Sequence, residues 1–97
     1  MIAMATYVIM DVEVTDPATY RSLLERAAAA VVARGGKYLV RAGVMEVVQG
    51  DWKPHRLVVV EFDSAEQAEW RNSQDAIEVR EMLNKSSNAN ILIAEGE

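Results

Sequence analysis

The stretch that decides the fold consists of two segments, GGKYLVRAG at residues 35–43 and VQGDWKPHRLVVVEF at residues 48–62. The paired glycine is typical of a helix end followed by a strand, and we expect that strand to cover 38–49 with a bulge at 42–43. The turn at 50–54 leads into a strongly apolar strand over 56–62. The two segments therefore predict an antiparallel hairpin whose second strand is largely buried.

The flanking sequence completes a β-α-β-β-α-β order. Residues 7–14 alternate in polarity as a half-buried strand does, and Asp16-Pro17 caps a helix whose apolar positions recur at helical spacing as far as Gly35. Beyond the hairpin, a capping pattern predicts a helix over 64–72, Ser73 caps a further helix, and a last strand covers 91–94. Residues 1–97 thus predict one α+β, ferredoxin-like domain with both helices on one face of a four-stranded antiparallel sheet.

The second face of this sheet is too apolar to face water. Alternation places there Leu57, Val59, Ile9, Leu39 and one of Ile91 and Leu92. At ~1.5–3 kcal/mol each, exposing these side chains would forfeit on the order of 10 kcal/mol, which rivals the stability of a small domain. Since no other segment is available to cover them, we expect a homodimer that packs sheet against sheet.

Composition argues against several classes of function. A net charge of −5 without a basic stripe argues against nucleic-acid binding. The chain has no apolar run near the roughly 20 residues of a membrane span, and its N-terminus lacks a signal-peptide pattern, so we expect a cytoplasmic protein without membrane contact. With Cys 0, His 1 and no phosphate- or dinucleotide-binding glycine motif, we expect neither a metal nor a cofactor.

Several motifs resemble those of one bacterial family, the domain-of-unknown-function family 1330 of the dimeric α/β-barrel superfamily. The likeness covers residues 7–96, through DPxxY at 16–20, GGxYLxR at 35–41, GxWxPxRLVVxEF at 50–62, Ala68 and EG at 95–96. It implies a ferredoxin-like fold that dimerises through its sheets, and it implies no established activity.

This chain departs from the family pattern at three places. Relatives commonly carry a tyrosine where Ala76 stands and an arginine near Leu83, and they read Arg-Gly-Gly where this chain reads RAG at 41–43. A ligand site shared by relatives would therefore be altered here.

Arg41 is the strongest candidate for a ligand-binding residue. Alternation points it toward the dimer-facing side of the sheet, opposite Glu61 or Asp63. A guanidinium on an apolar face can bind a ligand carboxylate or carbonyl, whereas the alternative is a buried structural ion pair with Glu61. Glu61 itself is a weaker candidate, as a general base if burial raises its pKa.

The remaining candidates are aromatic or lie in loops. Trp70 and Tyr7 are further candidate ligand contacts, and His55 is a weak catalytic candidate that we expect to be exposed in its loop. We expect the others to be structural: Trp52 stapling the hairpin turn, Tyr20 and Tyr38 facing the helices, and Arg56 in an ion pair near a strand edge.

Three functions stay open at this point. The interpretation we favour is a homodimeric small-molecule-binding domain with an apolar cleft between sheet and helices, anchored by Arg41. The second is a cofactor-independent enzyme, monooxygenase- or isomerase-like, acting on a small organic acid or aromatic; it would need a carboxylate or histidine with a shifted pKa in a concave site. The third is an obligate dimer with a purely structural or regulatory role.

Overall fold

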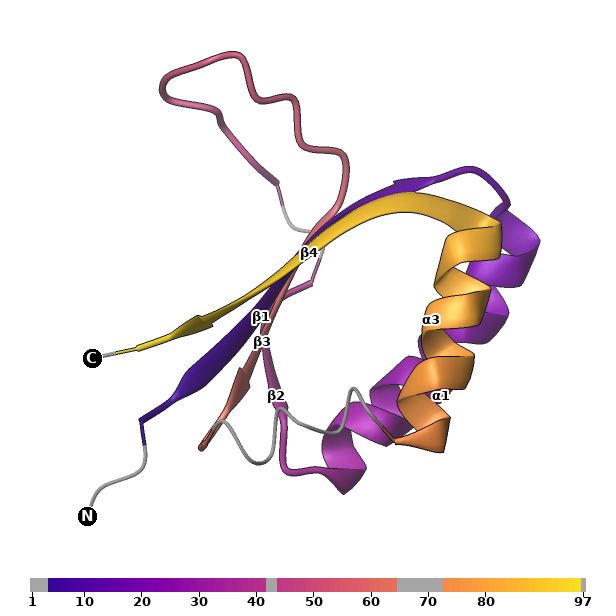
Figure 1. Ribbon diagram of the computed structural model, residues 1–97. Helices are drawn as coiled ribbons and strands as arrows, with labels where there is room; N and C mark the ends of the chain where they lie inside the picture. Colours follow the sequence, from indigo (N-terminus) through magenta and orange to yellow (C-terminus); the bar gives the residue numbers. More distant parts are fainter. Residues whose placement is uncertain (1–3, 42–43, 65–72, 97) are drawn as a thin grey trace.

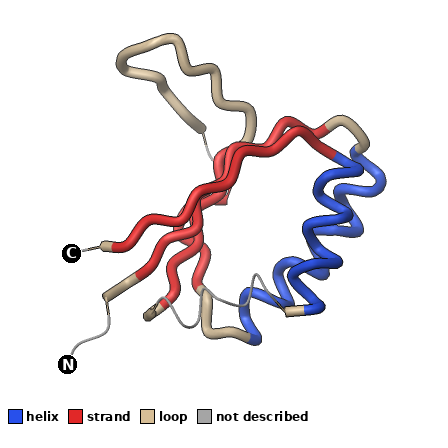
Figure 2. Tube along the Cα trace, in the orientation of Figure 1, coloured by secondary structure: helices blue, strands red, loops and turns tan. Residues whose placement is uncertain are grey.

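The computed structural model describes residues 4–41, 44–64 and 73–96. These residues form a four-stranded sheet with helices on one face (Figure 1). In chain order the elements are β1 (Thr6–Val14), α1 (Pro17–Ala33), β2 (Lys37–Arg41), β3 (Leu57–Phe62), α3 (Gln74–Ser86) and β4 (Ser87–Glu95). The strand order is β2-β3-β1-β4, and each neighbouring pair is antiparallel. Figure 2 shows α1 and α3 together on one side of the strands, so the predicted α+β, ferredoxin-like β-α-β-β-α-β fold is confirmed.

Helix α1 begins and ends where its capping residues predict. The Asp16 side chain accepts a hydrogen bond from the backbone N–H of Thr19 at 3.3 Å, and Pro17 occupies the first turn. At the other end Gly35 has a φ of 75°, and the N–H groups of Gly35 and Gly36 donate to the carbonyls of Val32 and Val31. This is the glycine-ended hydrogen-bond pattern that closes many helices.

Gly36 brings the end of α1 directly against the sheet. A Cβ built on it would lie 2.7 Å from Cε1 of Phe62 and 2.7 Å from Cγ1 of Val31. Because no side chain fits there, the paired glycine both ends the helix and starts β2 close to β3.

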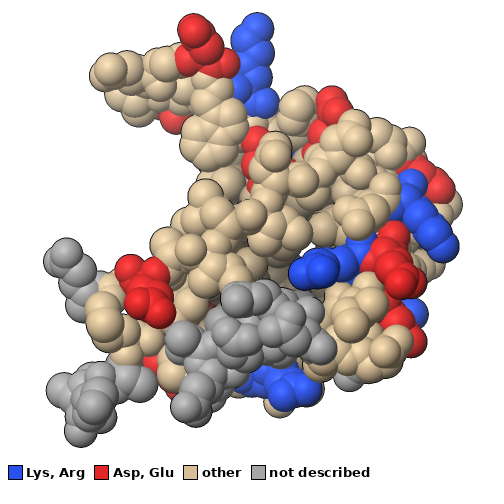
Figure 3. Space-filling view, viewed as in Figure 1, with Lys and Arg blue, Asp and Glu red and all other residues tan. Residues whose placement is uncertain are grey.

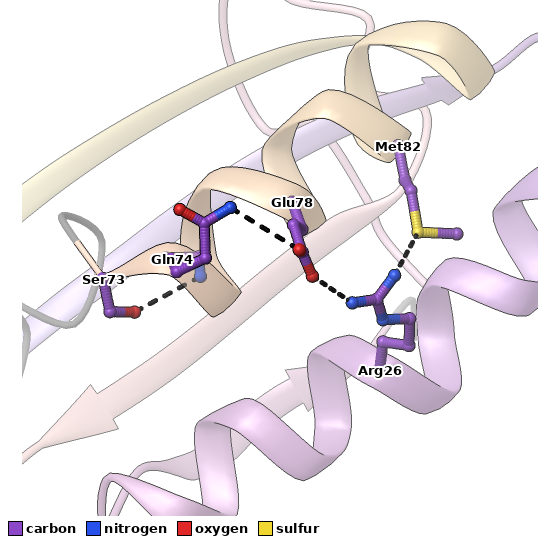
Figure 4. Close-up of polar contacts among 6 residues, drawn as sticks. Arg26, Ser73, Gln74, Glu78 and Met82 are labelled. Carbon is purple, nitrogen blue, oxygen red and sulfur yellow. Dashed lines mark hydrogen bonds and ion pairs between the residues drawn. The ribbon is translucent and has the colours of Figure 1, made fainter.

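Helices α1 and α3 contact each other through polar as well as apolar side chains (Figure 4). Arg26 of α1 forms an ion pair and hydrogen bond with Glu78 of α3, and it also points its guanidinium at Sδ of Met82, 3.6 Å away. Ser73 caps α3 as predicted, with its hydroxyl accepting from the N–H of Ala76 at 3.3 Å. Neither helix has the length and apolar composition that crossing a membrane would need.

The core lies on the face of the sheet that the helices cover, which we call the helix face. One buried cluster consists of Val8, Val31, Val58, Val60 and Phe62, and a second of Val12, Tyr20, Leu23, Val79 and Leu83. Met10 packs against both clusters. The predicted alternation of β1 and β3 is therefore confirmed, because their helix-face residues are the buried ones.

Two predicted strand boundaries differ from the structure by several residues. The strand predicted over 38–49 ends at Arg41, because Val44, Val47 and Val48 do not alternate with polar residues and continue as an exposed loop. Strand β4 begins at Ser87 rather than at 91, since it pairs with the whole length of β1. The bulge predicted at 42–43 and the helix predicted over 64–72 lie outside the described residues, apart from residue 64.

Candidate functional site

A cavity of about 520 Å³ lies between the helix face and the two helices. Figure 3 shows the surface hollowed at this place, with a basic side chain at its margin. Its walls are mostly aliphatic and come from both layers: Val8, Val58 and Val60 from the sheet, and Leu23, Val79 and Leu83 from the helices. A concave apolar space of this size is within the range of small-molecule sites, about 300–1,000 Å³.

Arg41 enters this cavity, on the side opposite to the predicted one. The register between β2 and β3 shifts between Tyr38 and Val40, so that Arg41 lies opposite Val58 and Tyr38 opposite Val60. Residues opposite each other in a sheet share a face, and Val58 and Val60 are on the helix face. The prediction that Arg41 faces the dimer side opposite Glu61 or Asp63 is therefore wrong, and the cause is one extra residue, Leu39, in β2.

The Arg41 guanidinium is held against an aromatic ring within the cavity. It lies 4.2 Å from the centroid of the Tyr38 ring. Tyr38 packs against the core cluster, as predicted. An arginine stabilised on a ring face keeps donors of its guanidinium fork available for a ligand.

Arg56 is a second cation in the same cavity, and sequence reasoning missed it. Its guanidinium carbon lies 5.5 Å from the centroid of the Tyr20 ring, and Tyr20 is buried as predicted. The predicted structural ion pair is wrong, because no carboxylate pairs with Arg56 among the described residues. The signal was present in the sequence: Arg56 lies two residues before Val58 and so shares its alternation.

Three wall residues from helix α3 lie at or near positions where this chain departs from the family pattern. Arg80 lines the cavity as a third cation, and Ala76 and Leu83 are buried beside it. Ala76 and Leu83 are the positions at which the resemblance predicted an altered site. They do lie in the cavity, so substitutions there change its shape directly.

The chemistry of the described lining residues is cationic and phenolic. They include neither a carboxylate nor a histidine. Burial raises the pKa of Tyr20, opposed by the charge of Arg56, and burial likewise raises the pKa of Tyr38, opposed by Arg41. Both phenols are therefore neutral hydrogen-bonding groups at physiological pH, and the charged groups of the described wall are cations.

Tyr7 and Glu61 lie together on the other face of the sheet, which we call the open face. They are opposite each other in the β1–β3 register, and Lys37 rather than Arg41 is the β2 residue opposite Glu61. A hydrogen bond to Glu61, together with its charge, raises the pKa of Tyr7. Neither residue lines the cavity, so the structure separates these two candidates from Arg41.

His55 belongs to a polar cluster that ties the loop before β3 to the open face. Asp11 of β1 accepts hydrogen bonds from the backbone N–H of His55 and from Nε1 of Trp52, both at 2.9 Å. Nε2 of His55 lies 3.1 Å from a carboxylate oxygen of Glu13, and the His55 side chain is 54% exposed. The predicted exposed loop histidine is confirmed, and Trp52 anchors the loop to β1. Trp70, the remaining candidate, lies outside the described residues.

The fold and the cavity define the class of protein: it is a ferredoxin-like α+β domain with a ligand-sized cavity between its sheet and its helices. Residues 5–97 match the family described as "Domain of unknown function (DUF1330)", and the chain belongs to that family. This is the family that the sequence motifs resemble. No functionally curated protein matches the chain.

Solved structures with the same fold are distant in sequence. The crystal structure of methylated RPA0582 protein matches with a TM-score of 0.76 at 10% identity, covering 98% of this chain and 82% of that one. A second structure, of the RPA0582 protein of unknown function from Rhodopseudomonas palustris, has a TM-score of 0.74 at 10% identity and covers 97% and 83% of the two chains. At such identity the likeness shows the fold alone.

Proposed function

We propose that this protein is a homodimeric small-molecule-binding domain whose ligand occupies the cavity between the helix face and the helices. The observation that carries the proposal is the cavity itself, about 520 Å³ in a chain of 97 residues. Protein interiors are close-packed and keep few voids larger than a water molecule. An unfilled apolar space of this size costs stability unless a ligand fills it.

The lining residues favour binding over the two alternatives. The cofactor-independent enzyme considered above needs a carboxylate or histidine in the site, and the described wall offers arginines and neutral phenols instead. A purely structural dimer would fill the same space with side chains. Arg41 gives a binding domain what it needs, namely one fixed polar group in an apolar site.

The homodimer is proposed from the open face. One row of aliphatic side chains crosses all four strands there: Val40, Val59, Ile9 and Leu92. Leu92 is 54% exposed, and Val40, Val59 and Ile9 are half-buried. A second copy that presents the same row would bury both, which is the self-complementary contact of a two-fold dimer.

The experiment is a thermal-shift screen of small aliphatic and aromatic carboxylates, amides and phenols on wild-type protein and two variants. Ala27→Phe places a ring in the cavity, which Ala27 lines from α1, whereas Ala29→Phe places the same ring at an exposed position of that helix. A ligand at 100 times its dissociation constant adds about 2.7 kcal/mol to the free energy of unfolding. In a domain of this size that raises Tm by roughly ten degrees.

We expect at least one compound to raise the Tm of wild type and of Ala29→Phe but not of Ala27→Phe. Compounds that raise all three equally would bind outside the cavity and contradict the proposal. A library without any Tm shift would also contradict it, and would favour the structural or regulatory dimer.

A further inference from the structure

The charge of the described residues that line the cavity is opposite in sign to that of the whole chain. The protein has a net charge of −5, yet the charged residues among the described lining positions are Arg41, Arg56 and Arg80. Arg41 and Arg80 are exposed and Arg56 is half-buried. Three like charges around one apolar space repel each other, and a bound anion would relieve that repulsion.

Two of these arginines are neighbours on the sheet. Arg41 lies opposite Val58, and Arg56 is two residues before Val58, directly before β3 begins at Leu57; both line the cavity. Such diagonal positions have Cα atoms about 7–8 Å apart. Side chains as long as arginine can therefore reach a single carboxylate from both positions.

The orientation of both side chains is set by rings rather than by acids. Arg41 lies over Tyr38 and Arg56 over Tyr20. A ring face attracts the cation and leaves the N–H donors of the guanidinium for another acceptor. Burial also raises the pKa of both tyrosines, so their hydroxyls do not supply a negative charge.

The three arginines also lack an acidic partner among the described residues, in contrast to Arg26. Arg26, on the outside of the same helix pair, is ion-paired with Glu78. Within the described residues, none of Arg41, Arg56 and Arg80 is paired with a carboxylate. Guanidinium groups that are held in place at an apolar cavity and left without a counter-ion indicate a site for an external anion.

We infer that the cavity selects an amphipathic monoanion, with a carboxylate between Arg41 and Arg56 and an apolar chain or ring directed toward Val60 and Phe62. Arg80 faces the same carboxylate from α3. The inference rests on the proposed function and adds the chemical class of the ligand. The apolar part follows β3, whose six residues beyond Arg56 extend for roughly 20 Å.

The test compares octanoate with octanamide, which has the same chain length and no charge. Dissociation constants are measured by isothermal titration on wild type, Arg41→Gln, Arg56→Gln and the control Arg21→Gln, an exposed arginine of α1 that does not line the cavity. We expect wild type and Arg21→Gln to bind octanoate at least tenfold more tightly than octanamide. Each cavity variant should lose roughly tenfold or more in octanoate affinity and keep its octanamide affinity.

The ratio of the two affinities within one variant decides the matter, because partial unfolding weakens both ligands equally. An unchanged ratio in both cavity variants overturns the inference. Equal binding of octanoate and octanamide to wild type also overturns it, while leaving the proposed small-molecule site intact. Failure of both compounds, together with a thermal-shift library without hits, overturns the inference and the proposed function together.

Discussion

The two faces of the sheet use the same strands for different purposes. On the helix face, buried valines from β1 and β3 meet α1 and α3 and leave a cavity lined by arginines and tyrosines. The open face carries the aliphatic row and two polar groups. One is the pair of Tyr7 and Glu61, and the other is Asp11 with the hydrogen bonds that hold the loop before β3. The candidate ligand site belongs to the first face and the candidate dimer contact to the second.

A single residue in β2 decides which face receives Arg41. If Leu39 were paired in regular alternation after Tyr38, Arg41 would lie on the open face opposite Leu57. Because Leu39 is left out of the pairing, Tyr38 and Arg41 both face the helices. The comparison teaches that a bulge in a short edge strand can move a functional side chain from an interface to a cavity without changing the strand order.

The largest effect on stability should come from a substitution on the helix face at Phe62, which is 1% exposed. Phe62→Ala removes a ring that contacts the core cluster and the end of α1, and we expect a loss of about 3–5 kcal/mol in the free energy of unfolding. Urea denaturation at fixed protein concentration measures it. A loss below about 1 kcal/mol would contradict the packing described for this face.

The next effect concerns the open face. Val59→Asp puts a charge in the centre of the aliphatic row, and we expect self-association to weaken by about 100-fold or more, since a buried unpaired charge costs several kcal/mol. Sedimentation equilibrium at micromolar concentration measures it, with Arg21→Asp on exposed α1 as the control. If wild-type protein sediments as a monomer at this concentration, the proposed dimer is wrong.

A smaller effect is expected from deleting Leu39, the unpaired residue of β2. The paired residues on either side, Tyr38 with Val60 and Val40 with Val59, keep their register in the shortened strand. We expect unfolding to change by about 1 kcal/mol or less, and NMR contacts between Arg41 and the Tyr38 ring to persist. Loss of those contacts in a folded protein would show that the bulge does not set the direction of Arg41.

The smallest effect should be a pH dependence at the open face. Hydrogen bonds from the His55 backbone and from Trp52 lower the pKa of Asp11 below its ordinary value of 3.8. A lowered pKa in the folded state means that the carboxylate stabilises the fold above that ordinary value, and that this contribution is lost as the pH falls through the lowered value.

Asp11→Asn is the variant that measures this contribution. We expect its urea midpoint to lie below that of wild type at pH 7, and the two midpoints to converge in acid below the ordinary carboxyl pKa. A difference that stays constant down to acid would mean that the Asp11 charge does not hold the loop.

Sequence patterns predicted the fold well because each signal was local. Asp16 and Ser73 cap their helices, Gly35 ends α1, and the alternation of β1 and β3 separates buried from open-face residues. The predicted length of β4 was too short, because residues 87–90 are polar and adopt strand structure through pairing with β1.

The site was predicted only in part, because it depends on register between distant segments. Arg41 was predicted as a ligand-binding residue and lines the cavity, but its direction depends on a bulge that no sequence signal marked at Leu39. Tyr7 and Glu61 were grouped with it by alternation and lie on the other face. Arg56 and Arg80 come into the cavity only when β3 and α3 are brought together with β2 by the tertiary fold.

The most direct test of the central claim, that the helix face holds the ligand site, is a methyl NMR titration of wild-type protein with octanoate. The account predicts shift changes for methyl groups of Val8, Val58 and Leu83, which line the cavity, and none for Ile9, Val40 and Val59 on the open face. Changes confined to the open-face methyl groups, or no changes at all, would contradict it.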